Sequence, residues 1–287
     1  MNNKTVLIVY AHYADTSFNA ALLNTASSTL EKCGHKVTIS DLYKSQFNPV
    51  MGPNDIVGKQ RREDHFDYES ESGAAWEEGR LAPDVIAQQQ LLQAADLVIF
   101  QFPLQWGTWP AILKGWLDRV LTSGFAYSDG NVMDRAHLKG KKAILSFTTG
   151  GGPGYFTNTG IAGQLHVITW PMQNALRFVG LDILKPQVSF GPSLRGHEVR
   201  VQMLKDWERR LETIFEESPL FYFPLSAFEP QDGFPAEGMV LKEENTKNGL
   251  RTVGQNMGKP LPTSFCFFRP INGYVNGVDN SGDDSVD

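Results

Sequence analysis

The chain of 287 residues is long enough for one large α/β domain with a sizeable buried core, and too long for a mini-protein held together by disulfides. Its 26 Lys and Arg residues against 32 Asp and Glu residues give a net charge of −6, which excludes a basic field for nucleic acid or an anionic membrane. A phosphate-bearing ligand must therefore be bound by local groups. The 18 Phe, 8 Tyr and 6 Trp residues are enough to line a pocket for a flat ligand as well as a core.

The sequence carries no signal for export, membrane insertion or metal binding. The apolar run at Thr5–Tyr10 is too short for a signal peptide, and no apolar stretch reaches the roughly 18 residues of a membrane span. Cys33 and Cys266 lie far apart and match neither a metal-binding nor a redox spacing. We therefore expect a cytoplasmic protein without a metal, nucleic-acid or membrane partner.

Apolar runs separated by helical patterns set the predicted fold. Five runs read as strands covered on both faces, because they are nearly continuous rather than alternating: Thr5–Tyr10, 37–39, 97–100, 143–147 and 183–190. Helical spacing follows the first strand up to a C-cap at Gly34, begins again at Pro110 as the first helical residue, and recurs from Leu204 to Ile214. This alternation predicts an α/β fold, a flavodoxin-like doubly wound five-stranded parallel sheet.

Two regions fall outside this rhythm. Residues 44–82 are polar and charged, and they predict a long functional excursion between the second strand and its following helix. Prolines from Pro219 onward break any helical pattern. We therefore predict a sheet domain at 1–218, a small irregular C-terminal subdomain at 219–270 and a disordered acidic tail at 271–287.

The loops after the first, third and fourth strands hold the candidate ligand groups, because ligands bind beyond the carboxyl ends of parallel strands. Thr16, Ser17 and Asn19 place donors at a helix N-terminus, where a phosphate is favoured, although Ser17 or Asp15 could simply cap that helix. Trp106 and Trp109 flank Gly107 and suit a planar ring, unless both indoles only plug the end of the sheet.

The third of these loops, residues 148–156, is rich in glycine. Its bare backbone can approach a ligand closely, and its amides and the Thr148 and Thr149 hydroxyls can stabilise negative charge on a ring edge. Phosphate at the first loop and a flat ring between the other two are what a flavin requires.

The same segments resemble the NAD(P)H:quinone oxidoreductase family, also called DT-diaphorase. The matching strings are TSFN (16–19), AADLVIFQFPLQW (94–106), PAILKGW (110–116), FAY (125–127) and TTGG (148–151), and the resemblance continues to about residue 263 through VG (253–254) and MGK (257–259). It implies a homodimer with one FAD per subunit, sites built from both chains, and NAD(P)H and a quinone as substrates.

The resemblance also implies roles for individual residues. The flavin would be bound by His12, Thr16, Ser17, Phe18, Asn19, Pro103, Leu104, Gln105, Trp106, Gly107, Thr148, Thr149, Gly150, Gly151, Arg200 and Leu204. The substrate pocket would be lined by Trp106, Tyr127 from the partner subunit, Asp129 and Phe178, with ordinary core packing as the less favoured alternative for Phe178. Hydride transfer would take place beside Gly150, Gly151, Tyr155 and Phe156.

Several positions depart from the family pattern. Phe156 and Ala162 replace a tyrosine and a histidine that donate hydrogen bonds to the reduced flavin, so we expect Tyr155, backbone amides or water to take over. Asp129 replaces a second pocket tyrosine and should disfavour anionic acceptors. The C-terminal extension favours NAD(P)H over the dihydronicotinamide riboside that a shorter sibling branch uses.

Two other functions remain open at this stage. The same scaffold could serve an azoreductase or nitroreductase, because a flavin does not itself choose the acceptor. The missing donors at Phe156 and Ala162 also leave room for a slow flavin-binding regulatory protein.

Overall fold

A parallel sheet forms the centre of the protein in the computed structural model, which describes residues 3–244 apart from 63, 158 and 237. The strand order is β2-β1-β3-β4, and β5 and β6 both pair with β4 at the far edge. The strands are β1 (Thr5–Tyr10), β2 (Lys36–Asp41), β3 (Leu97–Pro103), β4 (Lys142–Thr149), β5 (Asp182–Ile183) and β6 (Gln187–Phe190). This is the predicted flavodoxin-like architecture, with the chain reversing direction across the sheet between β1 and β3.

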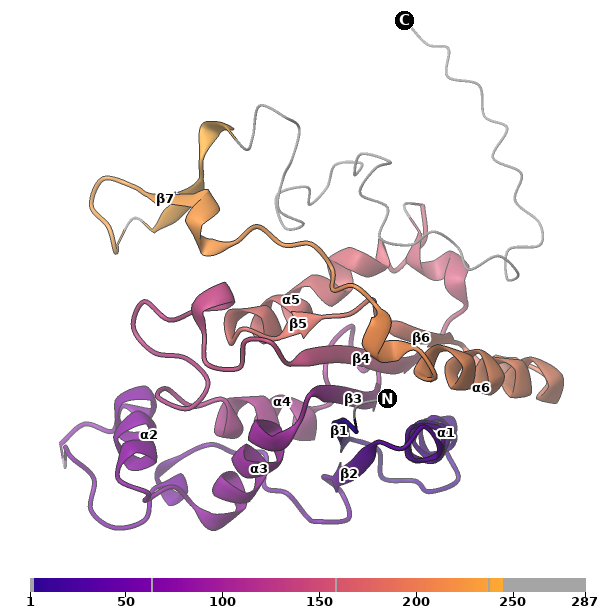
Figure 1. Ribbon diagram of the computed structural model, residues 1–287, viewed down its shortest axis with the longest axis horizontal. Coiled ribbons are helices and arrows are strands. Elements are labelled where there is room, and N and C mark those ends of the chain that lie inside the picture. The colour runs from indigo at the N-terminus through magenta and orange to yellow at the C-terminus, as the bar shows by residue number, and fades with distance from the viewer. Residues whose placement is uncertain (1–2, 63, 158, 237, 245–287) are drawn as a thin grey trace, which may run out of the picture.

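Helices cover both faces of the sheet (Figure 1). They are α1 (Phe18–Lys32), α2 (Tyr68–Glu77), α3 (Pro83–Ala94), α4 (Ala111–Val120), α5 (Leu165–Phe178) and α6 (His197–Leu211). One apolar cluster joins α1 and α6 to one face of β1, β3 and β4, and a second joins α3, α4 and α5 to the other face. The central strands are buried on both sides, which explains their continuous apolar runs.

The ends of α1 are formed by the residues that the sequence predicts. Ser17 is the N-cap of α1 and accepts a hydrogen bond from the Ala20 N–H at 3.1 Å, and Gly34 follows the helix with φ of +85°. Pro110 is the N-cap of α4 rather than its first helical residue, so the helix begins one residue later than predicted. Ile214 lies in a short turn beyond the end of α6.

Two of the predicted strands differ from expectation. β2 is an edge strand with one half-open face, so Ile39 is 43% exposed instead of covered on both sides. The predicted run 183–190 is split into β5 and β6 by residues 184–186. Pro186 lies in this break and has no N–H to donate to a sheet ladder.

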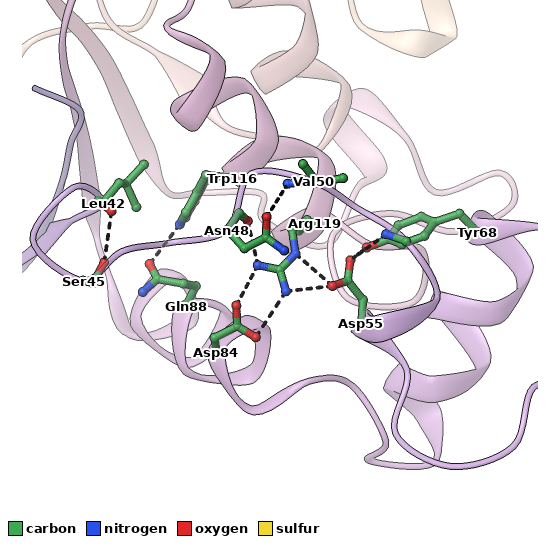
Figure 2. A network of polar contacts seen from close by, with 11 residues as sticks. Leu42, Ser45, Asn48, Val50, Asp55, Tyr68, Asp84, Gln88, Trp116 and Arg119 are labelled. Carbon is green, nitrogen blue, oxygen red and sulfur yellow. Dashed lines mark hydrogen bonds and ion pairs between the residues drawn. The ribbon is translucent and has the colours of Figure 1, made fainter.

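The excursion lies between β2 and α3, as predicted, but it contains a helix, α2, that the sequence analysis did not identify. A buried ion-pair network fixes this region (Figure 2). The Arg119 guanidinium in α4 lies between Asp55 at 2.7 Å and Asp84 at 2.6 Å, and the Tyr68 hydroxyl donates to Asp55 at 2.7 Å. Because Arg119 and Asp55 are almost fully buried, the excursion is clamped to the domain rather than loosely attached.

The segment after residue 218 runs over α5. The Arg177 guanidinium donates to the Phe223 carbonyl at 2.5 Å and lies 5.4 Å from the centre of the Tyr222 ring. Two short antiparallel strands follow, β7 (Phe228–Pro230) and β8 (Met239–Leu241). Residues 245–287, which include Cys266, the matches at 253–259 and the predicted tail, lie outside the described residues.

Candidate active site

Three loops meet at the carboxyl edge of the sheet, where β1, β3 and β4 end side by side in the strand order. Direct bonds hold the loops after β3 and β4 together, since the Leu104 N–H donates to the Thr148 carbonyl at 2.8 Å. This edge includes the point between β1 and β3 at which sheets of this kind bind their ligands. The structure therefore brings the predicted loop residues to one place.

The first loop presents donors suited to phosphate. His12 accepts a hydrogen bond at Nδ1 from the Ala14 N–H at 3.0 Å, and burial lowers its pKa, so both effects favour the neutral imidazole with its hydrogen on Nε2. The N–H groups of Phe18 and Asn19 in the first turn of α1 have no intrahelical acceptor. The Ser17 hydroxyl caps the helix, which is the simpler of the two roles expected for it, capping or phosphate binding.

The loop after β3 turns sharply at Trp106 and Gly107. Gln105 and Thr108 pair through both of their backbone groups, and Trp106 and Gly107 between them adopt positive φ of 50° and 75°. No acceptor among the described residues pairs with the N–H of either turn residue. The Trp106 side chain is fully exposed, so it does not plug the end of the sheet. Trp109 is buried and does plug it, with 4.9 Å between the centres of its ring and the Phe102 ring.

The glycine loop after β4 is held by Thr149 and open at Gly150. The Thr149 hydroxyl donates to the Gly151 carbonyl at 2.7 Å. A Cβ added to Gly150 would meet no atom within 4 Å, so a ligand can approach this backbone directly. The N–H groups of Gly150 and Gly151 find no acceptor in the described part of the chain.

Tyr155 and Phe156 have different surroundings. The Tyr155 ring rests on Gly151, because a Cβ added there would lie 3.0 Å from the ring, and the side chain is about half exposed. Phe156 packs inward against Phe190, with 5.7 Å between ring centres. Ala162 donates its N–H to the Tyr155 carbonyl at 2.9 Å. Of these side chains, only Tyr155 combines a hydroxyl with a position over the glycine loop.

Arg200 and Leu204 approach the same edge from α6, which starts soon after β6 ends. Arg200 lies in the first turn and donates to the Arg195 carbonyl at 2.9 Å. Leu204 packs against the cluster that α6 shares with α1. Arg200 is therefore placed near the carboxyl edge, and Leu204 lies one turn further along α6.

Tyr127, Asp129 and Phe178 are not brought to this edge. Tyr127 and Asp129 follow α4, and Phe178 ends α5 just before β5, so all three lie where the strands begin rather than where they end. Tyr127 and Phe178 contact each other edge to face, with 5.3 Å between ring centres. Within one chain they cannot line a pocket at the three loops.

The sequence analysis missed two buried polar residues under the loops. Gln101 in β3 and Ser146 in β4 are fully buried, and both connect through hydrogen bonds to Asn19. The sequence could have indicated both residues, because each puts a polar side chain into an apolar run of its strand. Arg119 was missed in the same way, as a charged residue between Trp116 and Val120 on a buried helix face.

The described residues contain no cluster of three or more His, Cys, Asp or Glu side chains that could hold a metal ion. In the same part of the chain, no helix is both long and apolar enough to cross a membrane.

The strand order and the three loops define a flavodoxin-like protein, and a family model described as having the flavodoxin-like fold matches residues 4–211. NAD(P)H dehydrogenase (quinone) 1 of Rattus norvegicus is 44% identical over 90% of this chain and 96% of the rat protein. Ribosyldihydronicotinamide dehydrogenase (quinone) of Homo sapiens is 44% identical over 77% of this chain and 96% of the human protein. A solved structure from Klebsiella pneumoniae, provisionally named a quinone reductase, has a TM-score of 0.75 and 31% identity over 84% of this chain and 95% of that one.

The chain thus belongs to the flavodoxin-like family of NAD(P)H:quinone oxidoreductases, which confirms the family resemblance noted from its motifs. The match to the rat protein extends past the sheet domain, since it covers 90% of this chain.

Proposed function

We propose that this protein is an FAD-dependent NAD(P)H:quinone oxidoreductase that reduces quinones by two electrons at a time. The observation that carries the proposal is the convergence of three loops with unpaired donors on one sheet edge. The family membership supports the same reaction, and the chemistry of the loops supports a flavin.

The donors present suit the separate parts of FAD. The first loop offers the neutral His12 imidazole and the free N–H groups of Phe18 and Asn19 to a pyrophosphate. The bare backbone at Gly150 leaves room for a flat ring beside the exposed Trp106 indole. The unpaired N–H groups of Trp106, Gly107, Gly150 and Gly151 would then hold the polar edge of that ring.

When bound, a flavin would supply two-electron chemistry, taking up a hydride at N5 from the nicotinamide and delivering a hydride, with a proton from solvent, to the quinone. The chain's own part is to fix the ring, keep the donor and then the acceptor stacked against it, and hold negative charge at its edge. Backbone N–H groups of the glycine loop supply that stabilisation, with the Tyr155 hydroxyl in place of the donors absent at Phe156 and Ala162. One pocket used in turn by NAD(P)H and quinone predicts ping-pong kinetics.

A second copy of the chain completes the pocket in this proposal. Tyr127 and Phe178 lie at the opposite edge of the sheet from the three loops, so they can line a pocket only on a neighbouring subunit. The proposal therefore includes a homodimer with two shared sites, located in the cytoplasm. Asp129, which is exposed two residues after Tyr127, adds negative charge to that wall.

The purified full-length protein provides the test. We expect a yellow protein that releases FAD on denaturation, loses its visible flavin absorption with NADPH in the absence of air, and recovers it on addition of a benzoquinone. A colourless protein that does not bind added FAD contradicts the proposal.

The choice of acceptor is tested separately. The values of kcat/KM for a benzoquinone, a naphthoquinone and an azo dye rank the candidate acceptors, and we expect a quinone to lead. Rapid bleaching by NADPH followed by faster turnover of the azo dye would instead assign an azoreductase. No bleaching of bound flavin would indicate a regulatory flavoprotein.

A further inference from the structure

A chain of buried polar side chains lies beneath the candidate flavin site. We call it the buried amide chain and define it as Ser146, Gln101, Asn19 and Thr148. The Ser146 hydroxyl donates to Gln101 Oε1 at 2.7 Å, Gln101 Nε2 donates to Asn19 Oδ1 at 2.9 Å, and Asn19 Nδ2 donates to Thr148 Oγ1 at 3.0 Å. The chain joins β4, β3 and α1 and returns to β4.

These side chains occupy positions where the sheet would otherwise be apolar. The face that α1 covers carries Leu97 and Ile99 in β3 and Ile144 in β4, and the same face continues with Gln101 and then Ser146. Gln101 and Ser146 are directly paired across the two strands and have no exposed surface. Apolar residues at these positions would pack without needing hydrogen-bond partners, whereas a buried polar group that loses its partner destabilises the fold.

The bonds fix the positions of two loops relative to each other. Asn19 stands in the first turn of α1, directly after the loop that follows β1, and its amide is bonded at both ends. Thr148 directly precedes Thr149 and the glycine loop. The two residues are 129 positions apart in the sequence, so their separation is set by tertiary contacts, namely the sheet register, the packing of α1 and the buried amide chain.

We propose that Gln101 is a positioning residue that, through Asn19 and Thr148, holds the first loop and the glycine loop at the spacing one flavin nucleotide needs. This inference rests on the proposed function, because it requires FAD to engage both loops at once. Gln101 does not touch the ligand. It makes the site ready before FAD arrives, which lowers the cost of ordering two loops on binding.

The proposal makes Asn19 part of the support as well as of the site. Its side-chain amide is bonded within the protein, so its contribution to a phosphate is the free backbone N–H of the helix start. Thr148 similarly uses its hydroxyl oxygen as an acceptor from Asn19.

The test compares Gln101→Leu with Gln89→Leu. Gln89 is a matched control because it is also buried, and its Nε2 donates to the Val120 carbonyl and the Thr122 hydroxyl, both at 3.0 Å, away from the three loops. Apoprotein is titrated with FAD, with lumiflavin, which can reach only the ring site, and with ADP, which can reach only the phosphate site. We expect Gln101→Leu to weaken FAD binding about tenfold or more while the affinities for lumiflavin and ADP change less than about twofold. Gln89→Leu should leave all three within about twofold.

A milder variant serves if Gln101→Leu does not fold. Ser146→Ala removes one terminal bond, and we expect it to weaken FAD binding about threefold with the fragments again unaffected. Equal FAD affinity in the Gln101 and Gln89 variants, or parallel losses for FAD and both fragments, overturns the inference. If the wild-type protein itself binds no FAD, the proposed function is wrong as well as this inference. That outcome is distinct from a loss of binding that is confined to the variants.

Discussion

The Tyr127 hydroxyl donates a 3.0 Å hydrogen bond to the carboxylate of Glu69, and this bond joins the segment after α4 to the first turn of α2. The aromatic pair of Tyr127 and Phe178 is thus held on its other side by the excursion between β2 and α3. The excursion is itself anchored one residue away, where Tyr68 donates to the buried Asp55. In the proposed dimer, α2 therefore helps to orient one wall of the neighbouring pocket.

The ionisation of Tyr127 should report this contact. Burial, followed by the hydrogen bond and charge of Glu69, raises the pKa of Tyr127 to about 12. Because an unfolded tyrosine titrates near pH 10, this group stabilises the fold fully below that pH, and its contribution is lost as the pH rises through 12. We expect Glu69→Gln to lower the pKa of Tyr127 toward the ordinary value without reaching it, since burial remains.

Ultraviolet titration of tyrosinate, taken as the difference from Tyr127→Phe, measures that pKa. Glu77→Gln, an exposed change at the other end of α2, is the control and should leave the titration unchanged. Identical curves for Glu69→Gln and wild type would show that the hydrogen bond does not operate in solution.

Arg119 should be among the residues most sensitive to substitution. Burial lowers its pKa, but the hydrogen bonds to Asp55 and Asp84 outweigh that effect and the pKa is raised overall. We expect Arg119→Met to reduce the free energy of unfolding by about 3–5 kcal/mol, because it leaves the buried Asp55 carboxylate without its cationic partner. Denaturant unfolding measures this loss. Arg62→Met, which breaks an exposed pair with Asp64, should cost less than about 1 kcal/mol, and similar losses in both variants would contradict the argument.

Gly115 lies where the excursion passes over α4. A Cβ at this position would lie 2.1 Å from the Pro49 carbonyl oxygen and 2.5 Å from its Cα, so the backbone of one segment must move. In an open helix Gly→Ala stabilises by about 1 kcal/mol. Here we expect Gly115→Ala to destabilise by about 1–3 kcal/mol.

Thermal unfolding shows whether Gly115→Ala lowers or raises the stability of the protein. Gly52→Ala is the matched control, because its Cβ would meet no atom within 4 Å and its backbone is extended. A stability of Gly115→Ala equal to or above that of wild type would mean that Pro49 moves away at little cost.

Tyr155→Phe tests the replacement of the missing donors. The substitution keeps the ring on Gly151 and removes only the hydroxyl. If that hydroxyl donates to charge developing at the flavin, stopped-flow reduction by NADPH should slow by about tenfold or more. Tyr13→Phe removes another exposed hydroxyl at the first loop and should not change the rate. An unchanged rate in Tyr155→Phe would leave the stabilisation to the backbone N–H groups.

Much of the fold followed from local patterns in the sequence. The apolar runs of β1, β3 and β4 are continuous because both faces are covered, and the ends of α1 are set by Ser17 and Gly34. Residues 44–82 were recognised as an excursion, but α2 was not, since its mixed composition lacks a clear apolar stripe. The break between β5 and β6 was also missed, although Pro186 marks it.

For the site, the sequence alone determined which loops carry ligand chemistry, because glycines, hydroxyls and indoles after strands act through their local backbone. Only the tertiary structure decided that Trp106 is exposed while Trp109 is buried, and that Tyr127 and Phe178 lie at the opposite edge from the loops. It alone paired Asn19 with Thr148 and Arg119 with Asp55. The physical reason is that turn chemistry depends on neighbours in the chain, whereas a buried polar group is satisfied by whatever the strand register and helix packing place within hydrogen-bond distance.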